Sequence, residues 1–137
     1  MTHIRVGLAQ VSPTPDLSQN LSTALEFMKR AASKEVEILC FPEAHLAGYR
    51  AGILDPEAPC DSSLLAEALE QVAASCRELS LAVVLGTETP NPAGKPFNSA
   101  VVIDDRGGDD RTTSQVTSDA QRVAGLLTGP RADDVHF

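Results

Sequence analysis

The chain has 137 residues, enough for one small domain, and its 11 Lys and Arg against 19 Asp and Glu give a formal net charge of −8. This acidic balance argues against nucleic acid or an anionic membrane surface as the main partner, because both bind a cationic face. A hydrophobic fraction of 42% is sufficient for a packed core and excludes disorder over most of the chain.

The sequence shows neither a membrane span nor a secretion signal. No stretch approaches the roughly 20 apolar residues that a transmembrane helix needs, and the N-terminal residues lack the apolar segment and cleavage site of a signal peptide. The three cysteines, Cys40, Cys60 and Cys76, are widely spaced and form no CxxC pair. We therefore expect a cytoplasmic protein with reduced thiols.

The first predicted elements are a strand and an amphipathic helix. Residues 4–11 are apolar and rich in β-branched side chains, and a segment with two prolines ends this strand because proline cannot donate to a ladder. A helix capped by Asp16 or Ser18 then extends to about Ser33, with apolar residues at intervals of three or four.

A second strand and a second helix follow. The strand is predicted over 36–41 and ends at a proline, after which residues 45–61 form a loop rich in Gly, Pro and Asp. The helix begins at Asp61 or Ser62 and ends near Leu79, again with one apolar stripe.

Two more strands are predicted over 81–86 and 99–104, so the element order is β-α-β-α-β-β. Two strand-helix-strand units imply parallel crossovers and a layered α/β fold. The strands at 4–11 and 81–86 are apolar on both faces, which predicts a sheet that is covered on each side.

The composition changes after Gly107. Residues 108–137 contain many Asp, Ser and Thr, no Lys and no clear hydrophobic period. We therefore divide the chain into a folded part, 1–107, and a divergent tail, 108–137, that we expect to be irregular or poorly ordered.

Glu43 is the candidate catalytic residue. Open α/β sheets bind ligands at the carboxyl ends of their strands, and Glu43 directly follows the second predicted strand in Cys40-Phe41-Pro42-Glu43. Apolar surroundings beside Phe41 would disfavour the charged carboxylate and raise its pKa towards the range of a general base. The alternative is a solvated or helix-capping glutamate at a strand exit.

Several motifs occur together along the chain: Ile4 to Gln10, Asn20, Glu37 to Glu43, Gly48-Tyr49, Gly86-Thr87-Glu88 and Phe97 to Asp104. In this order they resemble the nitrilase, or carbon-nitrogen hydrolase, superfamily. The combination of an apolar strand, Phe-Pro-Glu and then Gly-Tyr is the most specific part, and the resemblance covers about residues 4–107.

The resemblance implies the N-terminal half of an αββα sandwich and hydrolysis of non-peptide C–N bonds in small amides, nitriles or carbamoyl compounds, without a cofactor. In this family a Glu-Lys-Cys triad acts: the cysteine attacks, the glutamate is the general base and the lysine stabilises the tetrahedral intermediate. Glu43 matches the glutamate. Thr113 stands in the lysine position, and the nucleophile would fall beyond residue 137.

The cysteines present are not expected to replace that nucleophile. Cys40 and Cys76 lie in apolar patterns typical of buried residues. Cys60 is expected to be exposed, with Asp61 beside it raising the pKa of the thiol and weakening it as a nucleophile.

Two further residues could lie near Glu43. His45 is interpreted either as lining the same pocket or as an ordinary polar loop residue. Glu88 ends the third predicted strand at the same sheet edge, but no His or third acid accompanies the two carboxylates, so we expect no metal site.

Two hypotheses about function remain open at this point. The chain is the N-terminal part of a carbon-nitrogen hydrolase, incomplete through a frameshift or divergence and inactive alone, or it is a non-catalytic binding or assembly module that kept the fold. Because half a sandwich leaves apolar sheet surface uncovered, we expect self-association. A flavodoxin-like domain fits the element order but lacks a phosphate-binding loop after the first strand.

Overall fold

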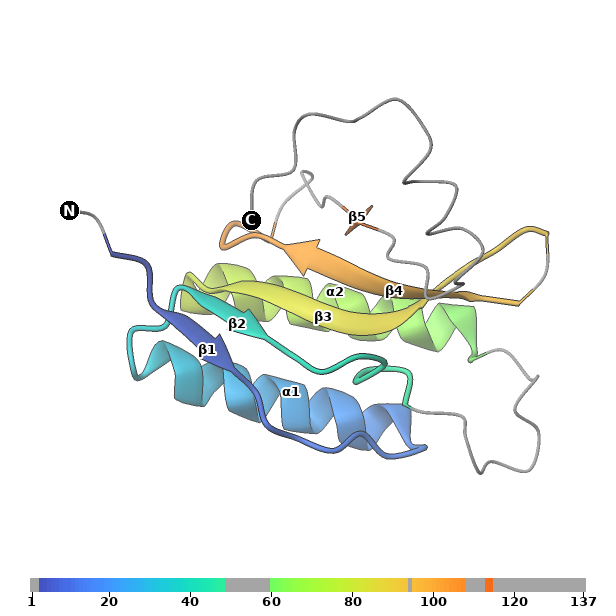
Figure 1. Ribbon diagram of the computed structural model, residues 1–137, viewed down its shortest axis with the longest axis horizontal. Coiled ribbons are helices and arrows are strands. Elements are labelled where there is room, and N and C mark those ends of the chain that lie inside the picture. The colour runs from blue at the N-terminus through green and yellow to red at the C-terminus, as the bar shows by residue number, and fades with distance from the viewer. Residues whose placement is uncertain (1–2, 49–59, 94, 108–112, 115–137) are drawn as a thin grey trace, which may run out of the picture.

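The computed structural model describes residues 3–48, 60–93, 95–107 and 113–114. One five-stranded sheet, in the order β1-β2-β3-β4-β5, lies against two helices (Figure 1). The elements are β1 (Val6–Leu8), α1 (Leu17–Ala32), β2 (Ile38–Cys40), α2 (Ser62–Leu79), β3 (Ala82–Thr89), β4 (Phe97–Ile103) and β5 (Thr113–Ser114).

The pairing of the strands confirms the predicted parallel crossovers. β1 pairs with β2 and β2 with β3 in parallel, so that Val6, Ile38 and Ala82 stand side by side. β4 is antiparallel to β3 and β5 is antiparallel to β4. The chain therefore contains two β-α-β units followed by a hairpin.

Each helix begins at an aspartate. The Asp16 carboxylate accepts hydrogen bonds from the backbone N–H groups of Ser18 (2.8 Å) and Gln19 (3.3 Å), and these bonds lower the pKa of Asp16. Asp61 caps α2 in the same way, accepting from the backbone N–H of Ser63 at 2.9 Å. Of the two candidates that the sequence offered for each helix, the aspartate is the cap in both.

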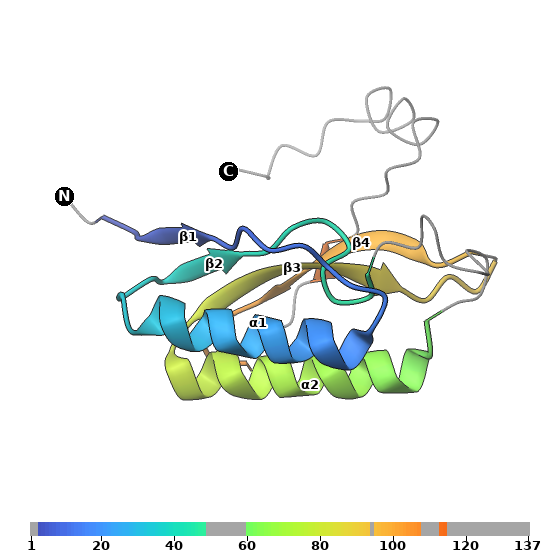
Figure 2. The same ribbon diagram turned by 90° about the horizontal axis from the view of Figure 1, so that it is seen from below.

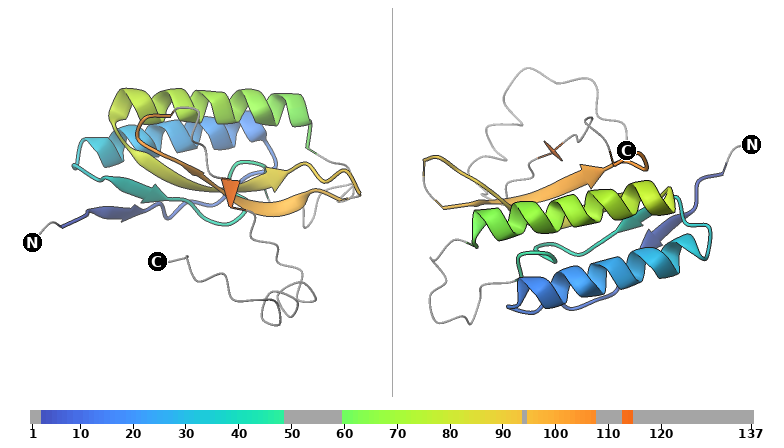
Figure 3. Two further views of the ribbon diagram at one scale, coloured as in Figure 1. Left: turned by 90° about the horizontal axis from the view of Figure 1, so that it is seen from above. Right: turned by 180° about the vertical axis from the view of Figure 1, so that it is seen from behind.

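The hydrophobic core lies between the helices and one face of the sheet. α1 and α2 run side by side on this face (Figures 2 and 3). Met28, Val72, Leu85 and Ile103 are fully buried there. We call this the core face and the other the open face.

The prediction of a sheet covered on both sides is wrong for β1 within the described residues. Both helices lie on one face, so Val6 and Leu8, which alternate away from the helices, keep 55% and 76% of their surface exposed. In register beside Leu8 stand Cys40, Val84 and Val102, all only partly buried. The open face therefore carries an apolar strip formed by these four residues.

The strand lengths differ from the predicted ones. β1 and β2 each have 3 residues, fewer than the sequence pattern indicates, whereas β3 has 8 because its pairing with β4 continues beyond the end of β2. β5 is a short strand within the tail that we predicted to be irregular. The rest of that tail, and most of the predicted 45–61 loop, lie outside the described residues.

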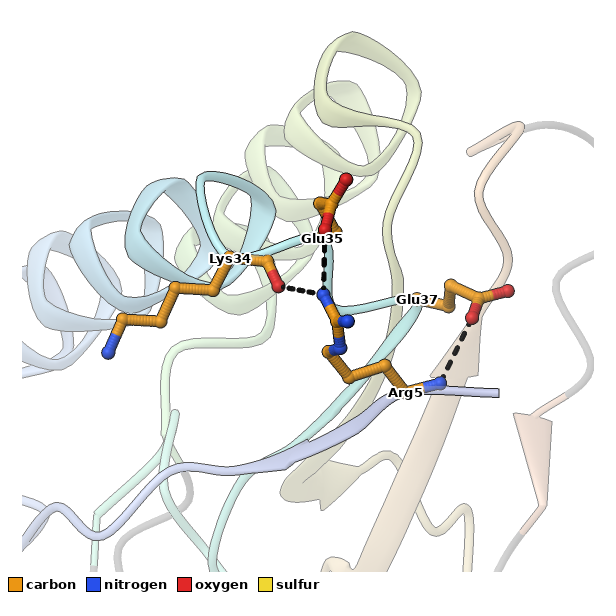
Figure 4. Close-up of polar contacts among 4 residues, drawn as sticks. All are labelled: Arg5, Lys34, Glu35 and Glu37. Atoms are coloured by element: carbon orange, nitrogen blue, oxygen red, sulfur yellow. Dashed lines mark hydrogen bonds and ion pairs between the residues drawn. The ribbon is translucent and has the colours of Figure 1, made fainter. Parts of the chain in front are cut away.

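Arg5 attaches the start of β1 to the turn between α1 and β2 (Figure 4). Its backbone N–H donates to the Glu37 carboxylate at 3.0 Å, and its guanidinium donates to the Lys34 carbonyl at 2.7 Å and pairs with Glu35 at 3.0 Å. The ion pair is exposed and adds little stability, so the backbone pairing carries this connection.

None of the helices in the described part of the chain is long and apolar enough to cross a bilayer.

Candidate active site

A tight turn over residues 43–47, here called the Glu43 turn, follows β2 and lies against β3. The backbone N–H of Phe41 donates to the Val84 carbonyl at 2.9 Å, and that of Leu46 donates to the Gly86 carbonyl at 3.0 Å. These two bonds continue the attachment of the chain to β3 after β2 has ended.

Gly86 allows this close approach. A Cβ atom at position 86 would lie 2.3 Å from the Pro42 carbonyl oxygen and 2.8 Å from the Glu43 Cα, distances that no side chain tolerates. The missing side chain therefore lets the Glu43 turn rest directly on the backbone of β3.

Asn20 holds the other side of the turn. This side chain is 1% exposed, and its amide nitrogen donates to the carbonyl groups of Thr14 (2.7 Å) and Leu46 (3.2 Å), while its oxygen accepts from the backbone N–H of Thr14 (2.7 Å). One buried amide thus connects the segment after β1 to the Glu43 turn after β2.

Glu43 lies at the carboxyl end of β2 and reaches across to β4. Its Oε1 accepts a hydrogen bond from the Asn98 side-chain amide. Glu43 is exposed among the described residues, so the burial that would raise its pKa is not found there. Both residues line a pocket of about 250 Å³, together with Phe41, Val84, Gly86, Ser99 and Ala100.

Both interpretations of His45 from the sequence are wrong, because the residue neither lines this pocket nor lies on the loop surface. It is fully buried and stacks on Phe41 with ring centroids 5.0 Å apart. Neither ring nitrogen has a hydrogen-bond partner among the described residues. Burial is the main influence on the pKa of His45 and lowers it, against a smaller opposing effect of the Asn20 backbone.

None of the three cysteines lines the Glu43 pocket, and no disulfide joins them. Cys76 is buried as predicted, and burial raises the pKa of its thiol to about 12. Cys40 is only partly buried, because Leu39 takes the position that faces the core. Cys60, predicted to be exposed, is partly buried at a separate pocket of about 610 Å³.

The remaining predicted residues are placed by the strand register. Glu88 pairs with Asn98 and lines the pocket of Cys60 rather than that of Glu43. Thr113 pairs with Val101. Within the described ranges, no group of three or more His, Cys, Asp or Glu could hold a metal ion.

Sequence reasoning missed the roles of three site residues that it quoted only as parts of motifs. Asn20 and Gly86 support the Glu43 turn, and Asn98 contacts the carboxylate itself. A polar residue in the outward-facing register of an otherwise apolar strand is the signal that singles out Asn98.

Comparison with known proteins identifies the family and the fold. The carbon-nitrogen hydrolase family model matches residues 5–120. An arylacetonitrilase of Fusarium vanettenii is 30% identical over 116 residues, which cover 76% of this chain and 34% of that protein. The solved NitN amidase of a Nesterenkonia species superposes with a TM-score of 0.67 at 21% identity, covering 82% of this chain and 44% of the amidase.

A carbon-nitrogen hydrolase of Helicobacter pylori gives a TM-score of 0.66 at 16% identity, covering 77% of this chain and 36% of that one. The fold is therefore the α/β arrangement of the N-terminal portion of a nitrilase-like αββα sandwich. The chain belongs to the carbon-nitrogen hydrolase family. It spans about a third of the length of the arylacetonitrilase and less than half of either solved relative.

Proposed function

We propose that the chain supplies the glutamate side of a site that hydrolyses a non-peptide C–N bond in a small amide, nitrile or carbamoyl compound. The observation that carries the proposal is the position of Glu43 at the carboxyl end of β2, in contact with Asn98 over a pocket of about 250 Å³. Relatives support the substrate class, since one is named an arylacetonitrilase and amidase structures hold acrylamide and butyramide.

In this proposal Glu43 is the general base. A carboxylate at a strand end can take the proton of an attacking thiol, and water then completes the hydrolysis to acid and ammonia, so no cofactor is needed. Such groups act as a unit, and a base without its nucleophile accelerates little. Among the described residues no thiol lines the Glu43 pocket, and the resemblance puts Thr113 in the lysine position, so we expect no turnover by this chain alone.

The test is ammonia release from butyramide and from an arylacetonitrile. We expect release indistinguishable from buffer, both for the unsubstituted chain and for Glu43→Gln. Release that Glu43→Gln abolishes and the matched Glu88→Gln retains would show that the chain is active by itself and would overturn the expected inactivity.

We propose that the change in composition after Gly107 arises from a frameshift or from divergence, and reading the gene beyond codon 107 in all three frames separates the two. A frame that carries a lysine and a cysteine in the family's motifs supports a hydrolase interrupted by a frameshift. If no frame carries them, divergence is the origin. The division of the chain at Gly107 stays a prediction.

A non-catalytic assembly module is the second candidate, and the exposed apolar strip on the open face favours it. We propose that two copies associate through this face, which would bury Leu8, 76% exposed in the single chain. In light-scattering chromatography we expect a dimer that Leu8→Glu converts to monomer. Leu64→Glu is the matched control, because Leu64 is 51% exposed on α2, away from the open face.

A sharp monomer peak of the unsubstituted chain at low micromolar concentration would contradict self-association. We also propose a cytoplasmic location, which the absence of disulfides among the three cysteines supports.

A further inference from the structure

The Asn98 side chain on β4 contacts the Glu43 carboxylate. The two residues are 55 positions apart in the chain and belong to different elements, yet the Asn98 amide donates directly to Glu43 Oε1. Asn98 and Ala100 are two of the three β4 residues that line the pocket, and they alternate with the buried Ser99 and Val101.

The backbone of Asn98 is held firmly. Its strand pairs with β3 over seven positions, from Val83 with Ile103 to Thr89 with Phe97. The hydroxyl groups of Thr89 and Ser99 are 2.6 Å apart, which fixes the same end of the hairpin. An amide on this strand is therefore a stable reference point for a side chain that reaches it from the Glu43 turn.

The Glu43 turn is attached to the same strand, β3, from the other side. Leu46 donates to the Gly86 carbonyl, and the missing side chain of Gly86 brings the turn onto the strand. Glu43 and Asn98 are thus both positioned by β3, one through the turn and one through the hairpin. Their contact follows from the backbone arrangement rather than from a flexible surface encounter.

The chemistry of the pair suits a base and its support. A side-chain amide N–H donates to a carboxylate but does not titrate, so it cannot remove or supply the proton itself. A hydrogen bond donated to a carboxylate favours its ionised form, which is the form that a general base needs. An exposed glutamate without such a bond would sample several rotamers.

We propose that Asn98 is a positioning residue, which keeps the Glu43 carboxylate ionised and turned into the strand-end pocket. This inference rests on the proposed role of Glu43. The charged neighbours along the packed elements are Glu88, which pairs with Asn98 on β3, and Lys95, two residues before β4. Asn98 makes no bond to the reacting atoms and acts only through Glu43.

The test is an NMR titration of the Glu43 carboxyl carbon in the whole chain, combined with scalar couplings that report its rotamers. Asn98→Leu keeps the branching at Cγ and removes the donor. We expect it to raise the pKa of Glu43 by about one unit and to average its rotamers. Asn98→Asp should raise it further, because a second carboxylate then faces the first.

Asn91→Leu is the matched control. Asn91 lies in the connection between β3 and β4, where its amide donates to the Lys95 carbonyl at 2.9 Å, and it does not line the Glu43 pocket. This variant should leave the titration and the rotamers of Glu43 unchanged. It also reports any general effect of losing an amide in the hairpin.

An unchanged Glu43 titration and an unchanged rotamer distribution in folded Asn98→Leu would overturn the proposal, even if the variant unfolds more easily. Should Asn98→Leu not fold, the same result in Asn98→Asp decides. This readout needs no catalysis, so it stands apart from the proposed hydrolase function, whose failure would show separately as absent binding of a small amide.

Discussion

The two faces of the sheet are built from similar apolar residues but differ in what covers them. On the core face, Val83 and Leu85 are fully buried beneath the helices. On the open face, the neighbouring Val84 is only partly buried and Leu8 is mainly exposed. The comparison shows that alternation along one strand separates the residues that stabilise the chain from those available for a site or a partner.

The Glu43 turn repeats this division within a few residues. His45 points into the core and stacks on Phe41, whereas Glu43 reaches the pocket on the open face. The buried half of the turn therefore supports the exposed half. Substitutions on each side should separate the two contributions.

The largest effect is expected where the turn itself covers the sheet. Gly86→Ala would place a Cβ 2.3 Å from the Pro42 carbonyl oxygen, so the turn must move, and we expect a loss of about 3 kcal/mol in the free energy of unfolding. Gly7→Ala is the matched control, because its Cβ would meet only side-chain atoms of Leu39 and Val36, each at 3.1 Å. It should cost less than about 1 kcal/mol.

Urea denaturation measures both variants. Equal losses in the free energy of unfolding for Gly86→Ala and Gly7→Ala would contradict a stabilising role for the close packing of the Glu43 turn on β3.

A pair of adjacent valines compares the two faces directly. Val83→Ala leaves a cavity beneath the helices and should cost about 2 kcal/mol, whereas Val84→Ala, on the partly exposed open face, should cost less than about 1 kcal/mol. The comparison uses urea denaturation at a concentration where the chain is monomeric. A larger loss for Val84→Ala would mean that the open face is covered in solution.

The smallest effect concerns the pH dependence of stability. Burial holds the pKa of folded His45 below its ordinary value of 6.5, so the unfolded chain binds the proton more tightly. The stability that the neutral, buried His45 contributes is complete above about pH 6.5 and is lost as the pH falls towards the folded pKa. The free energy of unfolding therefore rises with pH in that window.

His45→Phe should remove the part of the pH dependence of stability that comes from His45, while keeping the stacking on Phe41. The measurement is the denaturation midpoint at several pH values between 5 and 7. A slope unchanged in His45→Phe would contradict the burial of a neutral imidazole.

Local patterns in the sequence were sufficient to predict the helices, the parallel crossovers and the strand-end position of Glu43. The amphipathic period indicates the buried side of each helix, and a proline after an apolar strand marks its end. It did not identify every buried residue, because the predicted stripe of α1 centred on its leucines, whereas the fully packed positions are Asn20, Ala24, Met28 and Ala31. The cover of the open face could not be predicted this way, because apolar residues on a strand do not reveal where the covering layer comes from. Val6 and Leu8 illustrate this.

The site was harder to predict than the fold because its contacts join distant segments. Nothing in the local sequence indicates that Asn98 meets Glu43, or that Gly86 must lack a side chain to let the turn approach. His45 was misplaced for the same reason, since its burial depends on how the turn lies over the core. The resemblance covered about residues 4–107, whereas the family match reaches residue 120.

A titration of the chain with butyramide, followed by NMR, tests most directly whether the strand-end pocket beside Glu43 receives a small amide. We expect saturable shifts at Phe41, Glu43 and Asn98, weakened in Glu43→Gln. Shifts confined to the larger pocket around Cys60, or none at either pocket, would contradict it.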